Sequence, residues 1–195
     1  MIHPNISPEA LVRLGHIIAL WQSAGAHYVN LPWMASQDAV AATRPPERAP
    51  NTDIQTPFGF LLASGEQAFM ELCNNWIDGQ MYIGWTPCFR HEPVFDATHH
   101  YYFMKAEVFV PTTDTTVVRD VERVRNIAML GFESLLRLSN QSAHLEFRQT
   151  GANAYDIECN GIEVGSYGSR VYNNQRYVFA TALAEPRWSE AVGSV

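Results

Sequence analysis

The sequence predicts an α+β fold in which an antiparallel β-sheet is flanked by helices on one side. Four segments rich in aromatic and β-branched residues form two pairs with turn-forming residues between them, as in β-hairpins: 81–89 with 101–110, and 144–149 with 155–159. Two further segments show apolar residues at helical spacing. The chain has 195 residues and 47% hydrophobic residues, enough for one domain with a sizeable core.

The first predicted helix begins at Pro8, because Ser7 is a favourable N-cap and proline is favourable at the first helical position. Its buried stripe is predicted to be Leu11, Leu14, Ile17, Ile18 and Trp21. Gly25 is a plausible stop, and residues 27–31 are predicted to form a short strand that ends at Pro32.

Residues 33–56 contain three prolines among polar residues, which predicts a long surface loop. This loop is either a mobile lid over a binding site or a passive surface excursion. A helix is predicted next, from Ser64 as N-cap to about residue 75 or 79. Its buried stripe is expected to be Leu72, Cys73, Trp76 and Ile77.

Residues 111–116 supply caps for a long helix. Its predicted core positions are Val117, Val121, Val124, Ala128, Leu135 and Leu138. Asn160-Gly161 predicts a tight turn, and Gly165 and Gly168 mark either bulges or a close approach of a ligand. Residues 176–184 are predicted to form a closing helix, and 186–195 a tail.

Composition excludes several classes of function. The net charge of −7 argues against autonomous nucleic-acid binding, which needs clustered Lys and Arg, and makes tRNA binding doubtful. No apolar run approaches a membrane span, and the first residues resemble no signal peptide. The three cysteines have no paired spacing and indicate free thiols in a reducing compartment, so we expect a cytoplasmic protein.

Charged residues gather on the first predicted hairpin. Side chains alternate along a strand, so Arg90 and Glu92 share one face, as do Phe103, Lys105 and Glu107. A guanidinium binds a phosphate well, a carboxylate accepts from an amine, and an aromatic ring offers a stacking plane. The set suits a site for ATP and an amino acid. The alternative is an edge hairpin with ordinary cross-strand ion pairs.

The pattern Phe-Arg-x-Glu, a loop, then Phe-x-Lys-x-Glu resembles motif 2 of the class II aminoacyl-tRNA synthetases. By this resemblance Arg90 holds the α-phosphate of ATP and Glu92 the adenine amine. Phe103 stacks under the adenine, and Glu107 binds the α-amino group of the amino acid, with Lys105 also in the amino-acid site. His99 of the adjacent pair 99–100 replaces the basic loop residue that touches the β- or γ-phosphate, a role preferred to zinc binding.

Residues 154–170 resemble the strand of aspartyl- and asparaginyl-tRNA synthetases that carries Asp, Asn-Gly, Glu, glycines and Arg. Asp156, Glu163 and Arg170 follow at intervals of seven. The resemblance implies that the two acids hold Mg²⁺ on ATP, with Glu158 a possible substitute for Asp156. It also implies that Arg170 reads the amino acid's side chain, which points to aspartate or asparagine. Ammonia-dependent asparagine synthetase has a similar pattern.

Three more segments bear on the resemblance. Ser64-Gly65-Glu66-Gln67 is similar to the Ser-Gly-Gln element that touches the amino acid in that family, and either Glu66 or Gln67 faces the ligand. The first helix and strand resemble motif 1, which implies a homodimer. Motif 3, a glycine-rich strand and helix whose arginine clamps the γ-phosphate, has no clear counterpart, because Arg187 lacks the preceding glycines. Either residues 165–170 serve as a shortened motif 3, or the clamp is absent.

The resemblance implies ATP- and Mg²⁺-dependent activation of a small amino acid as an aminoacyl-adenylate. Arg90, Glu163 and Arg170 would carry the catalytic roles. Since the sequence contains no anticodon-binding domain, we expect an acceptor other than tRNA recognised by its anticodon. The alternatives are a non-catalytic synthetase paralogue that senses an amino acid or nucleotide, a subunit of a larger assembly, or a dimeric scaffold without a ligand.

Overall fold

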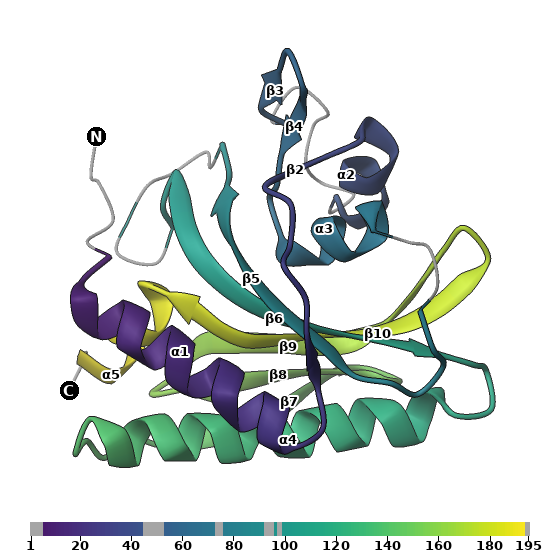
Figure 1. The fold of residues 1–195 in the computed structure, drawn as a ribbon. Helices are drawn as coiled ribbons and strands as arrows, with labels where there is room; N and C mark the ends of the chain where they lie inside the picture. The colour runs from purple at the N-terminus through teal and green to yellow at the C-terminus, as the bar shows by residue number, and fades with distance from the viewer. Residues whose placement is uncertain (1–5, 45–52, 73–75, 92–95, 97–98, 194–195) are drawn as a thin grey trace.

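A seven-stranded sheet forms the centre of the molecule in the computed structural model, which describes residues 6–44, 53–72, 76–91, 96 and 99–193 (Figure 1). Its strand order is β1-β5-β6-β10-β9-β8-β7, and every neighbouring pair is antiparallel except β1 and β5. The strands are β1 His27–Tyr28, β5 Tyr82–Phe89, β6 Tyr102–Thr112, β7 Leu145–Gly151, β8 Ala154–Cys159, β9 Ile162–Tyr172 and β10 Gln175–Glu185. The predicted α+β class and antiparallel sheet are confirmed.

A small three-stranded sheet rises above the large one, together with two short helices (Figure 1). Its strands are β2 Met34–Ala35, β3 Gln55–Thr56 and β4 Gly59–Leu61. The helices of the chain are α1 Pro8–Ser23, α2 Gln37–Thr43, α3 Gly65–Glu71, α4 Val117–Leu138 and α5 Arg187–Gly193. Helices therefore lie on both faces of the large sheet, so the prediction that they flank only one side was wrong. The two long helices, α1 and α4, do share one face.

The main core lies between the large sheet and the layer of α1, α4 and α5. The predicted stripe of α4 is buried except at Leu138, which is 49% exposed because it lies in the last turn. In α1, Leu14, Ile17 and Trp21 are buried, whereas Leu11 is 53% exposed. Burial of such a stripe is what holds an amphipathic helix on a sheet.

A second core fills the opposite face, under α2 and α3. Phe69 of α3 stacks on Phe109 of β6 at a centroid distance of 5.3 Å, and Phe109 stacks on Tyr177 of β10 at 4.8 Å. This aromatic row fixes α3 above the two central strands. The first turn of α3 consequently faces the polar side chains of the same strands.

The local signals in the sequence had mixed outcomes. Ser7 caps α1 as predicted, accepting from the Ala10 N–H at 3.3 Å. Asn160 and Gly161 have φ of 51° and 79° and turn β8 into β9, the positive-φ pair that a two-residue hairpin requires. The β8–β9 register skips one residue next to Gly165, so the predicted bulge is present there. A Cβ on Gly165 would lie 2.2 Å from the Tyr167 hydroxyl oxygen, which explains the glycine.

Several predicted elements were wrong. Residues 176–184 form strand β10 instead of a helix, and the predicted tail contains α5, anchored by the buried Trp188. Residues 33–56 contain α2 and two short strands. The helix after Ser64 ends at Glu71, and Ser64 makes no side-chain cap. Ile77 of its predicted stripe is 66% exposed, and Cys73 lies outside the described residues.

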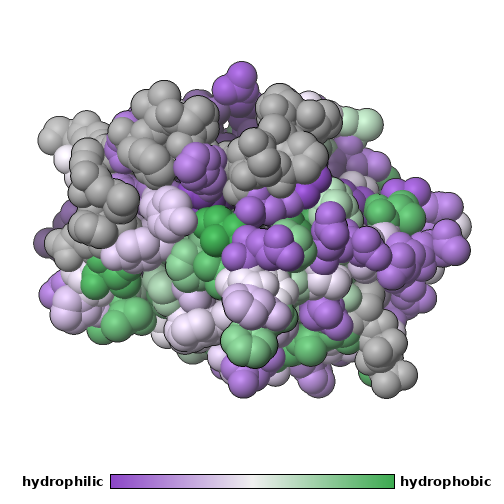
Figure 2. Space-filling view, turned by 90° about the horizontal axis from the view of Figure 1, so that it is seen from above, coloured by the Kyte–Doolittle hydropathy of each residue, from purple (hydrophilic) through white to green (hydrophobic). Residues whose placement is uncertain are grey.

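No helix in the described part of the chain is long and apolar enough to cross a membrane. Seen from above, the face with the small sheet is mostly hydrophilic, with apolar side chains in separate patches (Figure 2).

Candidate functional site

A cavity of about 290 Å³ lies between the central strands, α2 and α3, and the start of α5. Its volume is at the lower end of the range for small-molecule sites. Ten residues singled out from the sequence line it: Ser64, Glu66, Gln67, Arg90, His99, Phe103, Lys105, Glu107, Glu163 and Arg170. Asp156 is not among the lining residues, and Glu92 lies outside the described residues.

Glu107 lines this cavity and is buried, only 2% exposed. Its carboxylate accepts from the Ser64 hydroxyl at 2.8 and 2.9 Å and from the Glu66 N–H at 2.6 Å, and it forms an ion pair with Lys105. Glu107 thereby takes the capping position at the start of α3 that was predicted for the Ser64 side chain. A Cβ on Gly65 would lie 2.8 Å from this carboxylate, so the close approach requires glycine.

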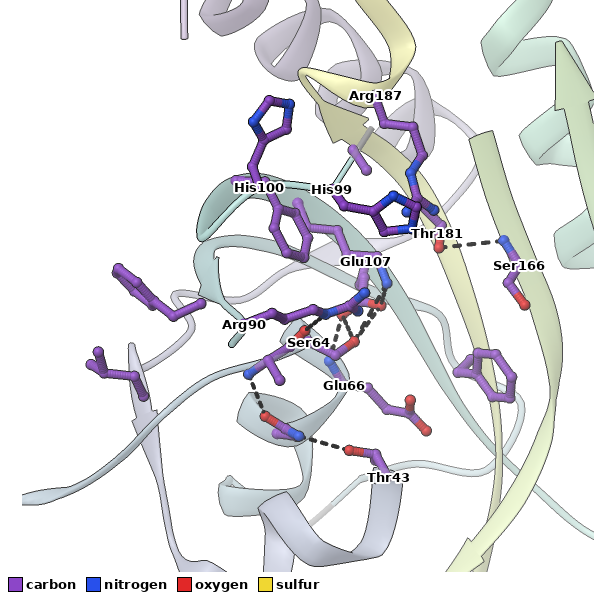
Figure 3. Close-up of a pocket in the computed structure, with 18 of the residues that line it drawn as sticks. Thr43, Ser64, Glu66, Arg90, His99, His100, Glu107, Ser166, Thr181 and Arg187 are labelled. Carbon is purple, nitrogen blue, oxygen red and sulfur yellow. Dashed lines mark hydrogen bonds and ion pairs between the residues drawn. The ribbon is translucent and has the colours of Figure 1, made fainter. Parts of the chain in front are cut away.

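Glu66 forms a second buried network. Its carboxylate accepts from Arg170 at 2.5 Å and from the Tyr177 hydroxyl at 2.6 Å. Glu66 is one of the labelled side chains of the pocket in Figure 3. Burial raises the pKa of Glu66, while the Arg170 guanidinium opposes that rise and the neighbouring Glu107 adds to it. Arg170 also lies over the Phe179 ring, 4.4 Å from its centroid, and its side chain keeps 40% exposure toward the cavity.

The Gln67 side chain of α3 forms hydrogen bonds to α2. Its side-chain oxygen accepts from the Ala63 N–H at 2.8 Å, and its amide donates to the Thr43 hydroxyl at 2.7 Å and the Val40 carbonyl at 3.4 Å (Figure 3). Glu66 and Gln67 therefore both line the cavity, but Gln67 holds α2 against α3 whereas Glu66 faces a cation.

The Arg90 end of the cavity combines a cation with an aromatic ring. The Arg90 guanidinium donates to the Ala63 carbonyl at 2.9 Å and lies 4.9 Å from the Phe103 ring centroid. His99 contacts Asp96 at 3.0 Å and lines the cavity, where it is drawn near Arg187, and the buried His100 lines the cavity as well (Figure 3). This end therefore offers positive charge and a ring face.

Glu163 lies across the cavity and forms an ion pair with Arg187 at 3.4 Å. Burial raises the pKa of Asp156, a hydrogen bond from Ser166 opposes that rise, and the nearby Glu163 charge adds to it. The two acids are thus close enough to interact, although only Glu163 reaches the cavity wall. Within the described residues, no three His, Cys, Asp or Glu side chains gather as a ready metal site.

Some lining residues were missed because β10 was predicted to be helical. Tyr177, Phe179 and Thr181 alternate along this strand and face α3 or the cavity, whereas Val178 and Ala180 between them enter the main core. In the sequence this segment is a nearly continuous apolar run with aromatic residues, which is consistent with a strand that is buried on both faces. Arg187 was noted in the sequence only for its missing glycines, yet it follows a strand, opens a helix and lines the cavity.

No protein-family model matches the chain, and no curated protein matches its sequence. Solved structures do match. The seryl-tRNA synthetase of Pyrococcus horikoshii, complexed with ATP, has a TM-score of 0.71 at 20% identity, over 93% of this chain and 49% of that one. The chain has the fold of a class II aminoacyl-tRNA synthetase catalytic domain.

Two further structures agree. The cytoplasmic serine-tRNA ligase of Naegleria fowleri, in complex with AMP, gives a TM-score of 0.71 at 16% identity over 94% of this chain and 48% of that chain. PylSc of Desulfitobacterium hafniense, a pyrrolysyl-tRNA synthetase, gives 0.70 at 13% identity over 99% and 70%. The chain spans about half the length of the two seryl enzymes. At these identities the likeness establishes the fold and leaves substrate and activity open.

Proposed function

We propose that this class II synthetase-like protein binds ATP, Mg²⁺ and a small amino acid and joins them into an aminoacyl-adenylate. The observation that carries the proposal is one cavity lined from two separate ribbons. Strands β5 and β6 bring Arg90 and Phe103, and β9 brings Glu163 and Arg170. A cation, a ring and a second charged cluster at one cavity are the parts that nucleotidyl transfer to a carboxylate needs.

In the proposed reaction the amino acid's carboxylate attacks the α-phosphorus of ATP, and pyrophosphate leaves with the electrons of the broken P–O bond. Arg90 would bind the α-phosphate and offset the charge that develops on it, and Phe103 would stack on the adenine. We add Arg187 to the predicted set, as the cation for the terminal phosphates. The support is its place after a strand and at the start of a helix, the arrangement expected of motif 3.

Magnesium fits the donor chemistry of the proposed site. Asp156 and Glu163 offer carboxylate oxygens, the ligands that Mg²⁺ prefers, and Mg²⁺ is commonly held by one or two carboxylates together with substrate phosphates. Burial is the main cause of the raised pKa of Asp156, and the nearby Glu163 charge adds to it; a bound cation would offset the repulsion between these two carboxylates. When bound, Mg²⁺ would supply charge neutralisation on the phosphates.

We propose asparagine rather than aspartate as the amino acid. The Arg170 guanidinium is already paired with the buried carboxylate of Glu66. Its remaining N–H groups can donate to the neutral side-chain carbonyl of asparagine without bringing a second negative charge into the site. A side-chain carboxylate would compete with Glu66 for the same guanidinium, and weakening the ion pair of a carboxylate that is only 4% exposed is costly.

The test is amino-acid-dependent exchange of labelled pyrophosphate into ATP across all twenty amino acids. We expect exchange with asparagine, and at least a tenfold loss in Arg90→Ala, because removing one charged contact to the transition state typically costs about that much or more. Arg137→Ala is the matched control, since Arg137 is 71% exposed on α4. Exchange with aspartate alone would refute the choice of amino acid but leave the adenylation proposal standing.

A non-catalytic paralogue that senses an amino acid or nucleotide, or acts as a subunit of a larger assembly, is the second candidate. It is favoured by Glu107, whose predicted role is to bind the amino acid's α-amine although Ser64, Glu66 and Lys105 already occupy its carboxylate. In that case no amino acid supports exchange, while ATP or an amino acid alone still raises the temperature of unfolding.

We also propose a homodimer formed through α1 and β1. Leu11 and Val12 of α1 are 53% and 62% exposed, and Tyr28 of β1 is 43% exposed, so both elements present large apolar side chains that a second copy could cover. Sedimentation equilibrium tests this, because Leu11→Glu should convert a dimer into a monomer. We also propose that the protein is cytoplasmic and that the acceptor of the activated amino acid is not a tRNA recognised through its anticodon.

A further inference from the structure

Glu185 is a buried acid at the point where β10 ends and α5 begins, with 0% exposure. The Arg13 guanidinium of α1 donates to its carboxylate at 2.6 Å. Ser189 donates to the same carboxylate twice, from its hydroxyl at 2.7 Å and its N–H at 3.2 Å. Arg13 also donates to the Ser189 hydroxyl oxygen at 2.7 Å, which closes the cluster.

These bonds hold the turn that carries Arg187. Glu185 precedes Arg187 by two residues and Ser189 follows it by two, so the cluster fixes the backbone on both sides. Between them Trp188 packs against Phe132 of α4 at a centroid distance of 5.1 Å. Arg187 lines the cavity instead, with its side chain 25% exposed and paired with Glu163 (Figure 3).

Arg13 itself is not part of the cavity wall, and its side chain is 14% exposed. If Arg13 were lost, the buried carboxyl of Glu185 would have only the two Ser189 donors among the hydrogen bonds of this cluster. A buried carboxylate in that condition draws in water or moves, and the turn moves with it. The position of Arg187 therefore depends on a residue far away in the sequence.

We infer that Arg13 is a positioning residue that holds Arg187 in place to bind the terminal phosphates of a nucleoside triphosphate. The inference rests on the proposed function, and it adds a residue that no motif indicates. Through Arg13, helix α1 would help the site to distinguish a nucleoside triphosphate from a monophosphate. A purely structural ion pair would instead lower stability without changing that discrimination.

The test compares the affinities for ATP and AMP, measured by isothermal titration calorimetry with Mg²⁺ present. Arg187→Met should weaken ATP binding roughly tenfold or more and leave AMP binding unchanged, as expected for a charged contact to the terminal phosphates. Arg13→Met should also lower the ratio of the affinity for ATP to the affinity for AMP. The double variant should bind ATP no more weakly than Arg187→Met. Arg13→Lys should recover part of the ratio, and Arg137→Met is the control.

An unchanged ratio in Arg13→Met, or an additive loss in the double variant, would overturn the inference. If Arg13→Met does not fold, Ser189→Ala gives the same comparison, because it removes only the hydroxyl that Arg13 and Glu185 share. Failure of the wild-type protein to bind ATP refutes the proposed function and this inference together. ATP binding with a ratio that ignores Arg13 refutes the inference alone.

Discussion

Replacing Arg170 by methionine tests the buried network beneath the candidate amino-acid site. The change removes the cation from Glu66, which is only 4% exposed and keeps the Tyr177 hydroxyl as a donor. Breaking a buried ion pair from one side typically costs about 3–5 kcal/mol, and the 40% exposure of the Arg170 side chain places the expected loss near 3 kcal/mol. For a protein of this size that lowers the unfolding temperature by roughly 6–12 °C.

The loss should depend on pH in a defined direction. Burial already raises the pKa of Glu66, and removing Arg170 raises it further because the guanidinium opposes that rise. When the folded pKa of an acid is raised above its unfolded value, the penalty is full above the folded pKa. It disappears as the pH falls toward the unfolded value of about 4.3. Urea unfolding followed by circular dichroism should therefore show a larger deficit at pH 8 than at pH 5.

The double variant Glu66→Gln/Arg170→Met is the matched control, since it removes both charges and leaves a neutral side chain for Tyr177. It should recover much of the lost stability and show little pH dependence relative to the wild type. A deficit that is equal at both pH values, or equal in the single and double variants, would contradict the assigned cause.

Two further predictions concern buried residues close to Glu107. Gly65→Ala should destabilise the protein by about 1–3 kcal/mol in urea unfolding, because its Cβ would lie 2.8 Å from the Glu107 carboxylate. The control Gly15→Ala, in α1 with nothing within 4 Å, should instead stabilise by about 0.5–1 kcal/mol, and equal effects would refute the reasoning. Cys88 is fully buried and its pKa is raised to about 12, so mass spectrometry should find it unlabelled by iodoacetamide at pH 8 until urea unfolds the chain. Rapid labelling in the native state would contradict its burial.

The sequence predicted those parts of the fold in which local patterns and tertiary packing agree. The hairpin of β5 and β6 satisfies both, because its strands are rich in aromatic and β-branched residues and are buried for most of their length. The long helix α4 does so as well, because its apolar stripe matches the face that it buries. Asn160-Gly161 is equally local, since positive φ at both positions specifies the turn.

The prediction of a helix at 176–184 was wrong because a nearly continuous apolar run fits a buried strand as well as a buried helix, and periodicity alone does not separate the two. The short helices α2 and α5 have seven residues each, so packing rather than propensity decides them. The sequence predicted most residues of the candidate site, but not the hydrogen bonds and ion pairs that they form with one another. No spacing reveals that Glu107 caps α3, or that Glu66 and Arg170 meet across 104 positions.

The most direct measurement is a crystal structure with a non-hydrolysable asparaginyl-adenylate analogue. The account predicts the adenine on Phe103, the α-phosphate mimic at Arg90 and the side-chain amide at Arg170, all within the one cavity. An analogue bound elsewhere on the surface, or a cavity that stays empty at saturating concentration, would contradict the claim that these ribbons form a single adenylation site.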